Sequence, residues 1–319
     1  MKRIGIMTSG GDAPGMNAAV RAAVRTAISL GMEVFGIERG YEGLLDGELK
    51  EMQWSSVGDI LQRGGTILKT ARSSRFMTEE GQTHAVDILE TFGIEGLVVI
   101  GGDGSFRGGQ ALSERGVTVM GVPGTIDNDM GYTDYTIGFD TAVNTVLSLI
   151  SNVRDTSSSH ERTTVVEVMG RNCGDIALYA GLGGGADVIL VPEAEYDINE
   201  VCRRVIRGQQ SGKLHSIIVK AEGVDISTAD LTHIVEERTG CEARAVVPGY
   251  IQRGGTPSAK DRILASRTAS KAVRLLYDDE PSKAVGVCGG ETIAYDLAEA
   301  VLMKREFDRS MYELAMTLA

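Results

Sequence analysis

Basic residues, cysteine, proline and long apolar runs are all scarce in this 319-residue chain. Lys and Arg total 32 against 44 Asp and Glu, which gives a formal net charge of −12. Non-specific nucleic-acid binding requires a basic face that neutralises phosphates, so the composition argues against that class of function. No apolar run approaches the about 20 residues that span a bilayer, so we expect no membrane segment.

The scarcity of cysteine argues against disulfides and cysteine-based metal sites. Cys173, Cys202, Cys241 and Cys288 lie far apart and form neither a C-x-x-C pair nor a Cys/His metal spacing. We expect reduced, mostly buried thiols in a cytoplasmic protein. The basic start MKRIGIMTSGGD reaches Gly-Gly-Asp before an apolar segment develops, so no secretory leader is expected.

Glycine is abundant where proline is not. The chain has 41 glycines and 6 prolines, which suggests many tight turns between strands and helices, and no Pro/Ser-rich linker marks a domain boundary. Hydrophobic residues make up 42% of the chain, enough for a full core. The length allows two domains or one large α/β domain.

Short apolar runs alternate with amphipathic stretches along most of the chain. The runs predict strands at residues 3–7, 34–37, 96–101, 117–122, 163–169, 188–191, 216–219, 243–247 and 284–287. Apolar residues at helical spacing predict helices at residues 17–30, 141–153, 198–207, 230–237 and 259–276. This β-α-β alternation is typical of mostly parallel sheets with helices on both faces. Ligands of such sheets bind beyond the carboxyl ends of the strands, so functional residues are expected there.

Two short motifs recur. Residues 62–66, QRGGT, are repeated at 252–256, and the Gly-Gly-Asp of residues 10–12 is repeated at 101–103. The recurrences suggest similar backbone turns, but they are too short to establish a duplication.

Glycine-rich turns follow two of the predicted strands. Residues 8–15, TSGGDAPG, match neither the dinucleotide-binding fingerprint nor the P-loop, and they fit an ordinary turn as well as an anion site. Residues 101–105, GGDGS, place Asp103 between glycines at the end of a buried strand. A carboxylate there can hold Mg²⁺ beside phosphates that lie along the glycine backbone. The alternative is a turn with a capping Asp.

Acidic residues are crowded after a third apolar run, in GTIDND at residues 124–129. If one carboxylate takes a proton from a hydroxyl and another helps to fix a metal, both must lie close to the transferring group. Asp127, Asp129 and the preceding Thr125 fit that arrangement. A solvated turn or a cap for the next helix is the alternative, and it fits less well because that helix is predicted only from residue 141.

Arginines recur near the ends of the predicted strands, at Arg72, Arg162, Arg171, Arg244 and Arg253. Guanidinium groups bind phosphate with two parallel hydrogen bonds, although any one of these arginines alone would fit a surface ion pair.

Two further features leave alternatives open. Glu222 fits either a sugar-binding carboxylate or a surface residue at a sheet edge, and Arg21 with Arg25 fits either a solvated pair or a second anion site. The pattern as a whole predicts a two-lobed α/β enzyme that uses Mg²⁺ to transfer a phosphoryl group to a phosphorylated or polyhydroxy substrate. A nucleotide or sugar sensor is the main alternative of another class, and it would not need Asp103, Asp127 and Asp129 together.

The motifs closely resemble those of the bacterial ATP-dependent 6-phosphofructokinases. The resemblance runs nearly end to end, through TSGGDAPGMNAA, QRGGTIL, GLVVIGGDGS, VPGTIDND, IGFDTA, SHERT, EVMGR, GDIA, AEG, QRGG and DR in order. It implies two α/β/α sandwich (Rossmann-like) domains with mostly parallel sheets. The large ATP-binding domain would comprise residues 1–138 plus 251–304, and the small fructose-6-phosphate-binding domain residues 139–250 plus 305–319. The enzyme would be a homotetramer that moves the γ-phosphoryl group of ATP to the 1-hydroxyl of fructose 6-phosphate.

The resemblance also implies roles for single residues. ATP would be held by Gly11, Arg72, Ser73, Gly102, Asp103, Gly104 and Ser105, with Asp103 on Mg²⁺. Asp127 would be the general base, with Thr125 and Asp129 beside it, and Arg171 would steady the transferring phosphoryl group together with Gly11 and Arg72. The sugar phosphate would be bound by Thr125, Ile126, Asp127, Met169, Gly170, Arg171, Glu222, Tyr250 and Arg253, and by Arg162 and Arg244 from a neighbouring subunit.

Several positions bear on specificity and control. Pyrophosphate-dependent members typically carry Asp and Lys where this chain has Gly104 and Gly124, which indicates ATP as donor. Tyr250 stands where the family usually has His. A second site for ADP or phosphoenolpyruvate would include Arg21, Arg25, Arg154, Gly185, Asp187, Ser211 and Lys213. Because Trp54 and Ser211 replace common basic residues and Asp187 replaces Glu, we expect weak allosteric control.

Overall fold

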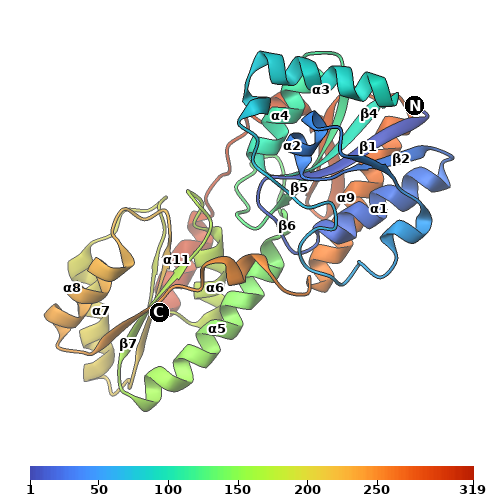
Figure 1. The fold of residues 1–319 in the computed structure, drawn as a ribbon. Coiled ribbons are helices and arrows are strands. Elements are labelled where there is room, and N and C mark those ends of the chain that lie inside the picture. Colours follow the sequence, from blue (N-terminus) through green and yellow to red (C-terminus); the bar gives the residue numbers. More distant parts are fainter. The chain divides into compact units, whose positions relative to one another are not determined.

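The computed structural model describes residues 1–319. The chain forms two compact units (Figure 1). Unit 1 comprises Met1–Ile126, Met130–Thr141 and Arg253–Arg305, and unit 2 comprises Asp127–Asp129, Ala142–Gln252 and Glu306–Ala319. No helix has the combination of length and apolar character needed to cross a membrane.

Unit 1 is built on one large sheet. Its strands follow the order β12-β11-β5-β4-β1-β2-β3, and β6 pairs with β5. The strands are β1 (Arg3–Ser9), β2 (Glu33–Ile37), β3 (Leu49–Glu51), β4 (Gly96–Gly101), β5 (Thr118–Thr125), β6 (Ile137–Gly138), β11 (Lys283–Cys288) and β12 (Glu291–Asp296). All pairs are parallel except β2 with β3 and β11 with β12, so antiparallel strands occur only at the two edges.

Helices cover both faces of this sheet. Figure 1 shows α1 (Met16–Ser29) and α9 (Ala259–Tyr277) together on one face, and they pack against each other. The other helices of unit 1 are α2 (Gly40–Leu45), α3 (Glu79–Phe92), α4 (Asp103–Ser113) and α10 (Leu297–Ala300). The central strands are apolar and fully buried because they are covered on both sides, as the continuous burial of β4 shows.

Unit 2 repeats the architecture on a smaller scale. Its four parallel strands follow the order β10-β7-β9-β8. They are β7 (Thr163–Val168), β8 (Val188–Leu190), β9 (Ser216–Ala221) and β10 (Ala243–Val246). The helices are α5 (Phe139–Ser159), whose first three residues belong to unit 1, α6 (Asp175–Gly184), α7 (Ile198–Gln210), α8 (Thr228–Thr239) and α11 (Arg309–Leu318). The predicted α/β class, with mostly parallel sheets between helical layers, is confirmed.

The recurring motifs differ in detail. The second glycine of each QRGGT copy is left-handed, with φ of 66° at Gly65 and 94° at Gly255, so the expected similarity holds there. The two Gly-Gly-Asp turns are not alike, because Gly10 has a φ of 86° whereas Gly101 does not have a positive φ. Asp103 also begins α4 directly, whereas α1 begins only at Met16. The expectation of similar turns was therefore wrong for Gly-Gly-Asp.

Candidate active site

Within unit 1, the turn after β1 is fastened to the segment that follows the first QRGGT copy. The Thr8 hydroxyl donates to the Lys69 carbonyl at 2.8 Å, and the Thr70 hydroxyl donates to the Gly10 carbonyl at 2.7 Å. The buried Asn17 side chain donates to the carbonyls of Arg63 and Gly64 and accepts from the Ile67 N–H at 2.8 Å. These hydrogen bonds therefore hold the glycine-rich turn and residues 63–70 together.

A second glycine-rich turn lies at the end of β4. Gly102 precedes α4, and Asp103 is its first residue, so the free backbone N–H groups of the helix start are available to an anion. A Cβ atom added at Gly104 would meet nothing within 4 Å, which shows open space beside this turn. Ser105 is buried, and its hydroxyl lies next to Gly10 and Gly101. These residues can surround a phosphate chain.

The side chains near this turn show how a metal ion could be bound. No group of three or more His, Cys, Asp or Glu side chains is arranged to hold an ion. Asp103 is half exposed at the start of α4 and pairs with Arg107, with its Oδ2 at 3.0 Å from Nε. Mg²⁺ is usually bound through one or two carboxylates plus substrate phosphates, so a single carboxylate beside an open phosphate-binding turn fits such an ion.

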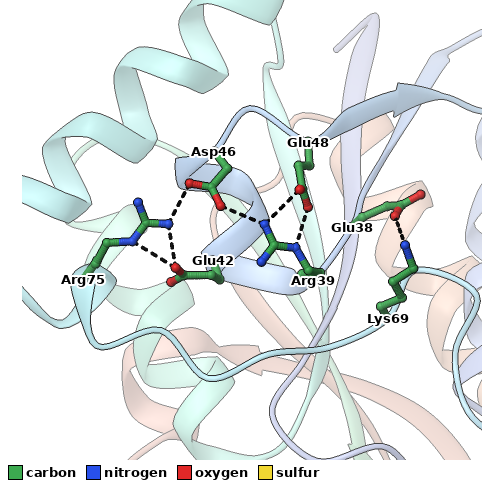
Figure 2. A network of polar contacts seen from close by, with 7 residues as sticks. All are labelled: Glu38, Arg39, Glu42, Asp46, Glu48, Lys69 and Arg75. Atoms are coloured by element: carbon green, nitrogen blue, oxygen red, sulfur yellow. Dashed lines mark hydrogen bonds and ion pairs between the residues drawn. The ribbon is translucent and has the colours of Figure 1, made fainter.

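A network of ion pairs fixes the segment that carries Arg72 and Ser73 (Figure 2). Before the segment, Lys69 pairs with Glu38 at 2.6 Å. After it, Arg75 pairs with Glu42 and Asp46 at 2.6 and 2.7 Å. Arg39, which is left-handed with φ of 58°, joins Asp46 to Glu48. The network ties residues 69–75 to α2 and the turn after it.

Hydrogen bonds in this network lower the pKa of its carboxyl groups. The pKa of Glu42 is lowered by hydrogen bonds from Ser73 and then Arg75, and that of Asp46 by Arg75 and then Arg39. Ser73 also accepts from the Phe76 N–H at 3.1 Å, so its hydroxyl supports the local turn. The Arg72 side chain is exposed on the same segment.

Asp46→Asn is expected to lower the melting temperature at neutral pH, because it removes the carboxylate shared by Arg39 and Arg75. A carboxyl group whose pKa is lowered on folding contributes stability above its unfolded-state pKa and loses it as the pH falls. The difference between wild type and variant should therefore shrink in thermal melts as the pH falls into the range where carboxylates protonate. Glu51→Gln, which removes an exposed charge on β3, is the control and should have little effect. A difference that stays constant with pH would contradict this account.

Other predicted residues of unit 1 lie close to these turns. The Thr125 side chain lies beside Gly102, where an added Cβ would be 3.4 Å from the Thr125 Cβ. Ile126 is buried, so its side chain belongs to the core. The Arg253 guanidinium lies against Gly11, where a Cβ would be only 2.4 Å from Nη1.

Within unit 2, the acidic segment at residues 127–129 contacts an arginine. Asp127 is 3% exposed, and its Oδ2 lies 3.2 Å from the Arg171 Nε. Asn128, fully buried between the two acids, has a left-handed φ of 53°. Its amide donates to Asp175 Oδ2 at 2.8 Å. The negative charge of Asp129 is one of the influences that raise the pKa of the Cys173 thiol, after burial and Asp175. The structure therefore brings Asp127 and Asp129 beside the loop after β7, which carries Arg171 and Cys173.

The loop after β7 is shaped by a carboxylate and an amide. Glu222 Oε1 accepts from the backbone N–H groups of Gly170 and Arg171 at 3.2 and 2.8 Å. Gln252, which is almost fully buried, accepts from the Met169 N–H at 3.1 Å. Gly223 allows the loop after β9 to approach the loop after β7, because a Cβ there would clash with the Arg171 carbonyl oxygen.

Two other predicted arginines lie at the opposite end of the same sheet. Arg162 precedes β7, whereas Met169 follows it, so the six-residue strand separates them by about 20 Å. Arg244 pairs with Glu242 at 2.7 Å, and Arg162 lies 3.8 Å from the same carboxylate. Arg244 is the second residue of β10, within the strand predicted at 243–247. Neither arginine can join the Met169–Arg171 loop of its own chain.

The residues expected at a second anion site form one cluster in each unit. In unit 1, the Arg25 guanidinium stacks on the exposed Trp54 ring at 4.6 Å, and burial followed by Arg25 lowers the pKa of Arg21. In unit 2, Lys213 pairs with Asp187, and Arg154 donates to the Gly185 carbonyl at 2.9 Å. The Ser211 hydroxyl donates back to the Gly208 carbonyl at 2.8 Å.

Tyr250, which was expected at the sugar-phosphate site, lies in a short 3-10 helix and is 81% exposed.

Comparison with known proteins decides the family. A family model described as phosphofructokinase matches residues 3–276. The chain belongs to the phosphofructokinase family. It is 58% identical over all 319 residues to the ATP-dependent 6-phosphofructokinase of Clostridium tetani, and 56% identical to that of Clostridium botulinum, with both partners covered completely. Enzymes of this family are phosphotransferases that act on an alcohol group, and this chain is one of them.

Solved structures of phosphofructokinases share the fold. The phosphofructokinase of Saccharomyces cerevisiae superposes with a TM-score of 0.93 at 35% identity, and 99% of this chain is covered. This chain spans half the length of the yeast chain.

Several residues that shape these loops were not found by sequence reasoning. Asn17, Asn128, Asp175 and Gln252 are all buried polar side chains. Each lies inside a motif that was noticed, so the motifs were located but the supporting roles of these residues were not. A polar residue inside an otherwise apolar or glycine-rich stretch was the available signal.

Proposed function

We propose that the chain is an ATP-dependent 6-phosphofructokinase. It would transfer the γ-phosphoryl group of ATP to the 1-hydroxyl of fructose 6-phosphate and release fructose 1,6-bisphosphate for glycolysis in the cytoplasm. The observation that carries the proposal is the contact between the buried Asp127 carboxylate and the Arg171 guanidinium, in a chain that matches ATP-dependent 6-phosphofructokinases over its whole length. A base and a guanidinium held together suit the activation of a hydroxyl and the stabilisation of a transferring phosphoryl group.

Asp127 would act on the acceptor hydroxyl. Its carboxylate takes the proton of the 1-hydroxyl as the oxygen attacks the γ-phosphorus, and the bond to the β-γ bridging oxygen breaks. Arg171 would stabilise the negative charge on the transferring group, because its guanidinium can release Asp127 and bind phosphoryl oxygens in the same region. Thr125 and Asp129 would orient the reacting groups beside it.

The strand-end turns of unit 1 would bind the nucleotide. Gly11, Gly102, Gly104 and Ser105 provide the phosphate-binding backbone, and Arg72 with Ser73 would complete the site from the segment fixed by the ion-pair network. Asp103 would hold Mg²⁺, which neutralises phosphate charge when bound. The open space at Gly104 supports ATP over pyrophosphate, because a nucleotide needs room beyond its phosphates.

The sugar phosphate would be bound by unit 2 and by residues around the second QRGGT motif. Met169, Gly170 and Glu222 would position the sugar, and Tyr250 and Arg253 would reach the 6-phosphate. Arg162 and Arg244 would complete a neighbouring subunit's site in a homotetramer. Their place at the far end of the sheet from Met169 supports this assignment.

The test is product identification. Purified enzyme with Mg²⁺, ATP and fructose 6-phosphate should yield fructose 1,6-bisphosphate, with phosphorus NMR showing the new phosphate on C1. Chelation with EDTA should abolish turnover, and added Mg²⁺ should restore it. Absence of turnover, or phosphate at another hydroxyl, would contradict the proposal.

Control by a second anion site is proposed to be weak. Asp187 pairs with Lys213, and Ser211 bonds to its own helix end, so these two positions offer little positive charge to an anionic effector. Ser211→Lys is expected to increase sensitivity to phosphoenolpyruvate or ADP, because one charge-assisted contact contributes about 1–3 kcal/mol. The measurement is the effector concentration that halves or doubles activity, with Thr317→Lys as the control. Cooperative inhibition of the wild type by micromolar phosphoenolpyruvate would refute weak control.

A further inference from the structure

The short segment Asp127–Asp129 carries the two acidic side chains, and contacts with the rest of unit 2 must hold it in place. β5 ends at Thr125 within unit 1, and the chain rejoins unit 1 at Met130. Only the three residues between Ile126 and Met130 have contacts that place them with unit 2. The contacts that hold these three residues against unit 2 therefore determine where the two carboxylates lie.

Asn128 makes the most buried of these contacts. Its side chain has no exposed surface, and its Nδ2 donates to Asp175 Oδ2 at 2.8 Å. Its backbone carbonyl accepts a weak hydrogen bond from the Cys173 thiol at 3.8 Å. Asp175 is 2% exposed and is the first residue of α6, where the helix start favours a negative charge. A hydrogen bond between a buried amide and a buried carboxylate is strong, and losing either partner is costly.

The loop that receives Asn128 is itself fixed. The Gly174 N–H, just before Asp175, donates to Glu193 Oε1 at 2.8 Å. The Arg171 N–H donates to Glu222 Oε1 at 2.8 Å, so both ends of the 171–174 loop are anchored. Asn128 therefore bonds to a rigid acceptor. Its left-handed backbone, with φ of 53°, is a conformation that Asn adopts more readily than most residues.

We propose that Asn128 and Asp175 are positioning residues for the catalytic base. Their hydrogen bond fixes the backbone at residue 128, and this holds the neighbouring Asp127 carboxylate at its 3.2 Å contact with Arg171. The inference rests on the proposed role of Asp127 in phosphoryl transfer. It predicts that losing the Asn128 amide lowers kcat without weakening the binding of either substrate.

Asn128→Gly separates the hydrogen bond from the backbone conformation. Glycine keeps the left-handed φ without strain but has no amide to donate. We expect kcat to fall by about 10²-fold, because a small displacement of a reacting group has an effect of that size, whereas KM for fructose 6-phosphate and for ATP stays close to wild type. Asp175→Asn retains an oxygen that accepts from Asn128, and its loss of kcat should be much smaller. Wild-type kcat in Asn128→Gly would overturn the proposal.

A double variant distinguishes positioning from a general structural role. If Asn128 acts through Asp127, then Asn128→Gly added to Asp127→Asn should lower kcat no further, measured at high enzyme concentration. A structural role that is independent of Asp127 would multiply the two losses of kcat. Failure of the proposed function is recognised separately, because a wild type without turnover or a fully active Asp127→Asn would refute the base and not the Asn128–Asp175 contact.

Discussion

Asp127→Asn is expected to lower kcat by about 10²–10⁴-fold, because the amide cannot accept the proton of the attacking hydroxyl. Asparagine has nearly the same shape as aspartate, so the packing around this buried side chain should survive. The variant also loses its charge partner for Arg171 at 3.2 Å, which leaves the guanidinium free to bind phosphate. KM for the two substrates should therefore change little while turnover falls.

The control for Asp127→Asn is an equal change of charge away from the site. Asp225 lies in unit 2 on the exposed turn after β9 and accepts from the Tyr196 hydroxyl at 2.8 Å. Asp225→Asn should leave kcat and KM close to wild type. An Asp127→Asn enzyme that retains a large part of wild-type kcat would show that another group takes the proton.

Arg244→Ala should raise KM for fructose 6-phosphate by about 10–150-fold, because a hydrogen bond to a charged group contributes about 1.5–3 kcal/mol. The reason lies in the geometry of unit 2. Arg244 and Arg162 share Glu242 at the amino end of the sheet, whereas Met169 and Arg171 lie beyond its carboxyl end. Under the proposed role, their effect on the sugar phosphate would be exerted in another subunit. Steady-state kinetics at saturating ATP measures the change.

Hybrid oligomers of two variants test whether Arg244 acts in a neighbouring subunit. Arg244→Ala subunits keep an intact Asp127, and Asp127→Asn subunits keep an intact Arg244. Hybrids formed by co-expression should therefore contain some sites with both groups, and the mixture should regain turnover with a wild-type KM. Each variant alone should lack that component. If no such component appears in the hybrids, Arg244 does not act across an interface. Wild-type protein held as an active monomer would contradict the assignment as well.

The repetitive part of the fold could be predicted from the sequence. Every predicted strand and helix corresponds to an element of the structure, because continuous apolar runs mark buried parallel strands and helical spacing marks amphipathic helices. Some predicted elements were too short because polar residues continue them, as in α5, which was predicted to end at residue 153 and extends to Ser159. Such residues continue the helix, but they add no apolar residue at helical spacing from which the helix could be predicted.

Several elements were missed, among them the amphipathic helices α3 and α11 and others that lack a clear period. α6, with the sequence DIALYAGLGG, is apolar on nearly all sides because it is buried, so it has no amphipathic pattern. β3 and β12 are partly exposed antiparallel edge strands whose residues lack a continuous apolar run. Each pairs with the strand just before it in the chain, and the Gly289–Gly290 turn between β11 and β12 was the available signal.

The candidate site was predicted as separate motifs, and its supporting contacts were not. The Asp127–Arg171 contact joins residues that are far apart in sequence, and no local pattern specifies it. The use of Glu222 to hold the Gly170 and Arg171 backbone was likewise not anticipated, because the residue type fits a sugar ligand equally well. The register of β7 with β9 brings Glu222 beside the backbone of Gly170 and Arg171.

The central claim is transfer of a phosphoryl group from ATP to fructose 6-phosphate. A coupled assay with fructose 6-phosphate and Mg²⁺, run first with ATP and then with pyrophosphate, tests it most directly. We predict turnover with ATP alone, because Gly104 leaves open space where a larger residue would narrow the site. Turnover with pyrophosphate would contradict the assigned donor, and no turnover with either donor would contradict the proposed reaction.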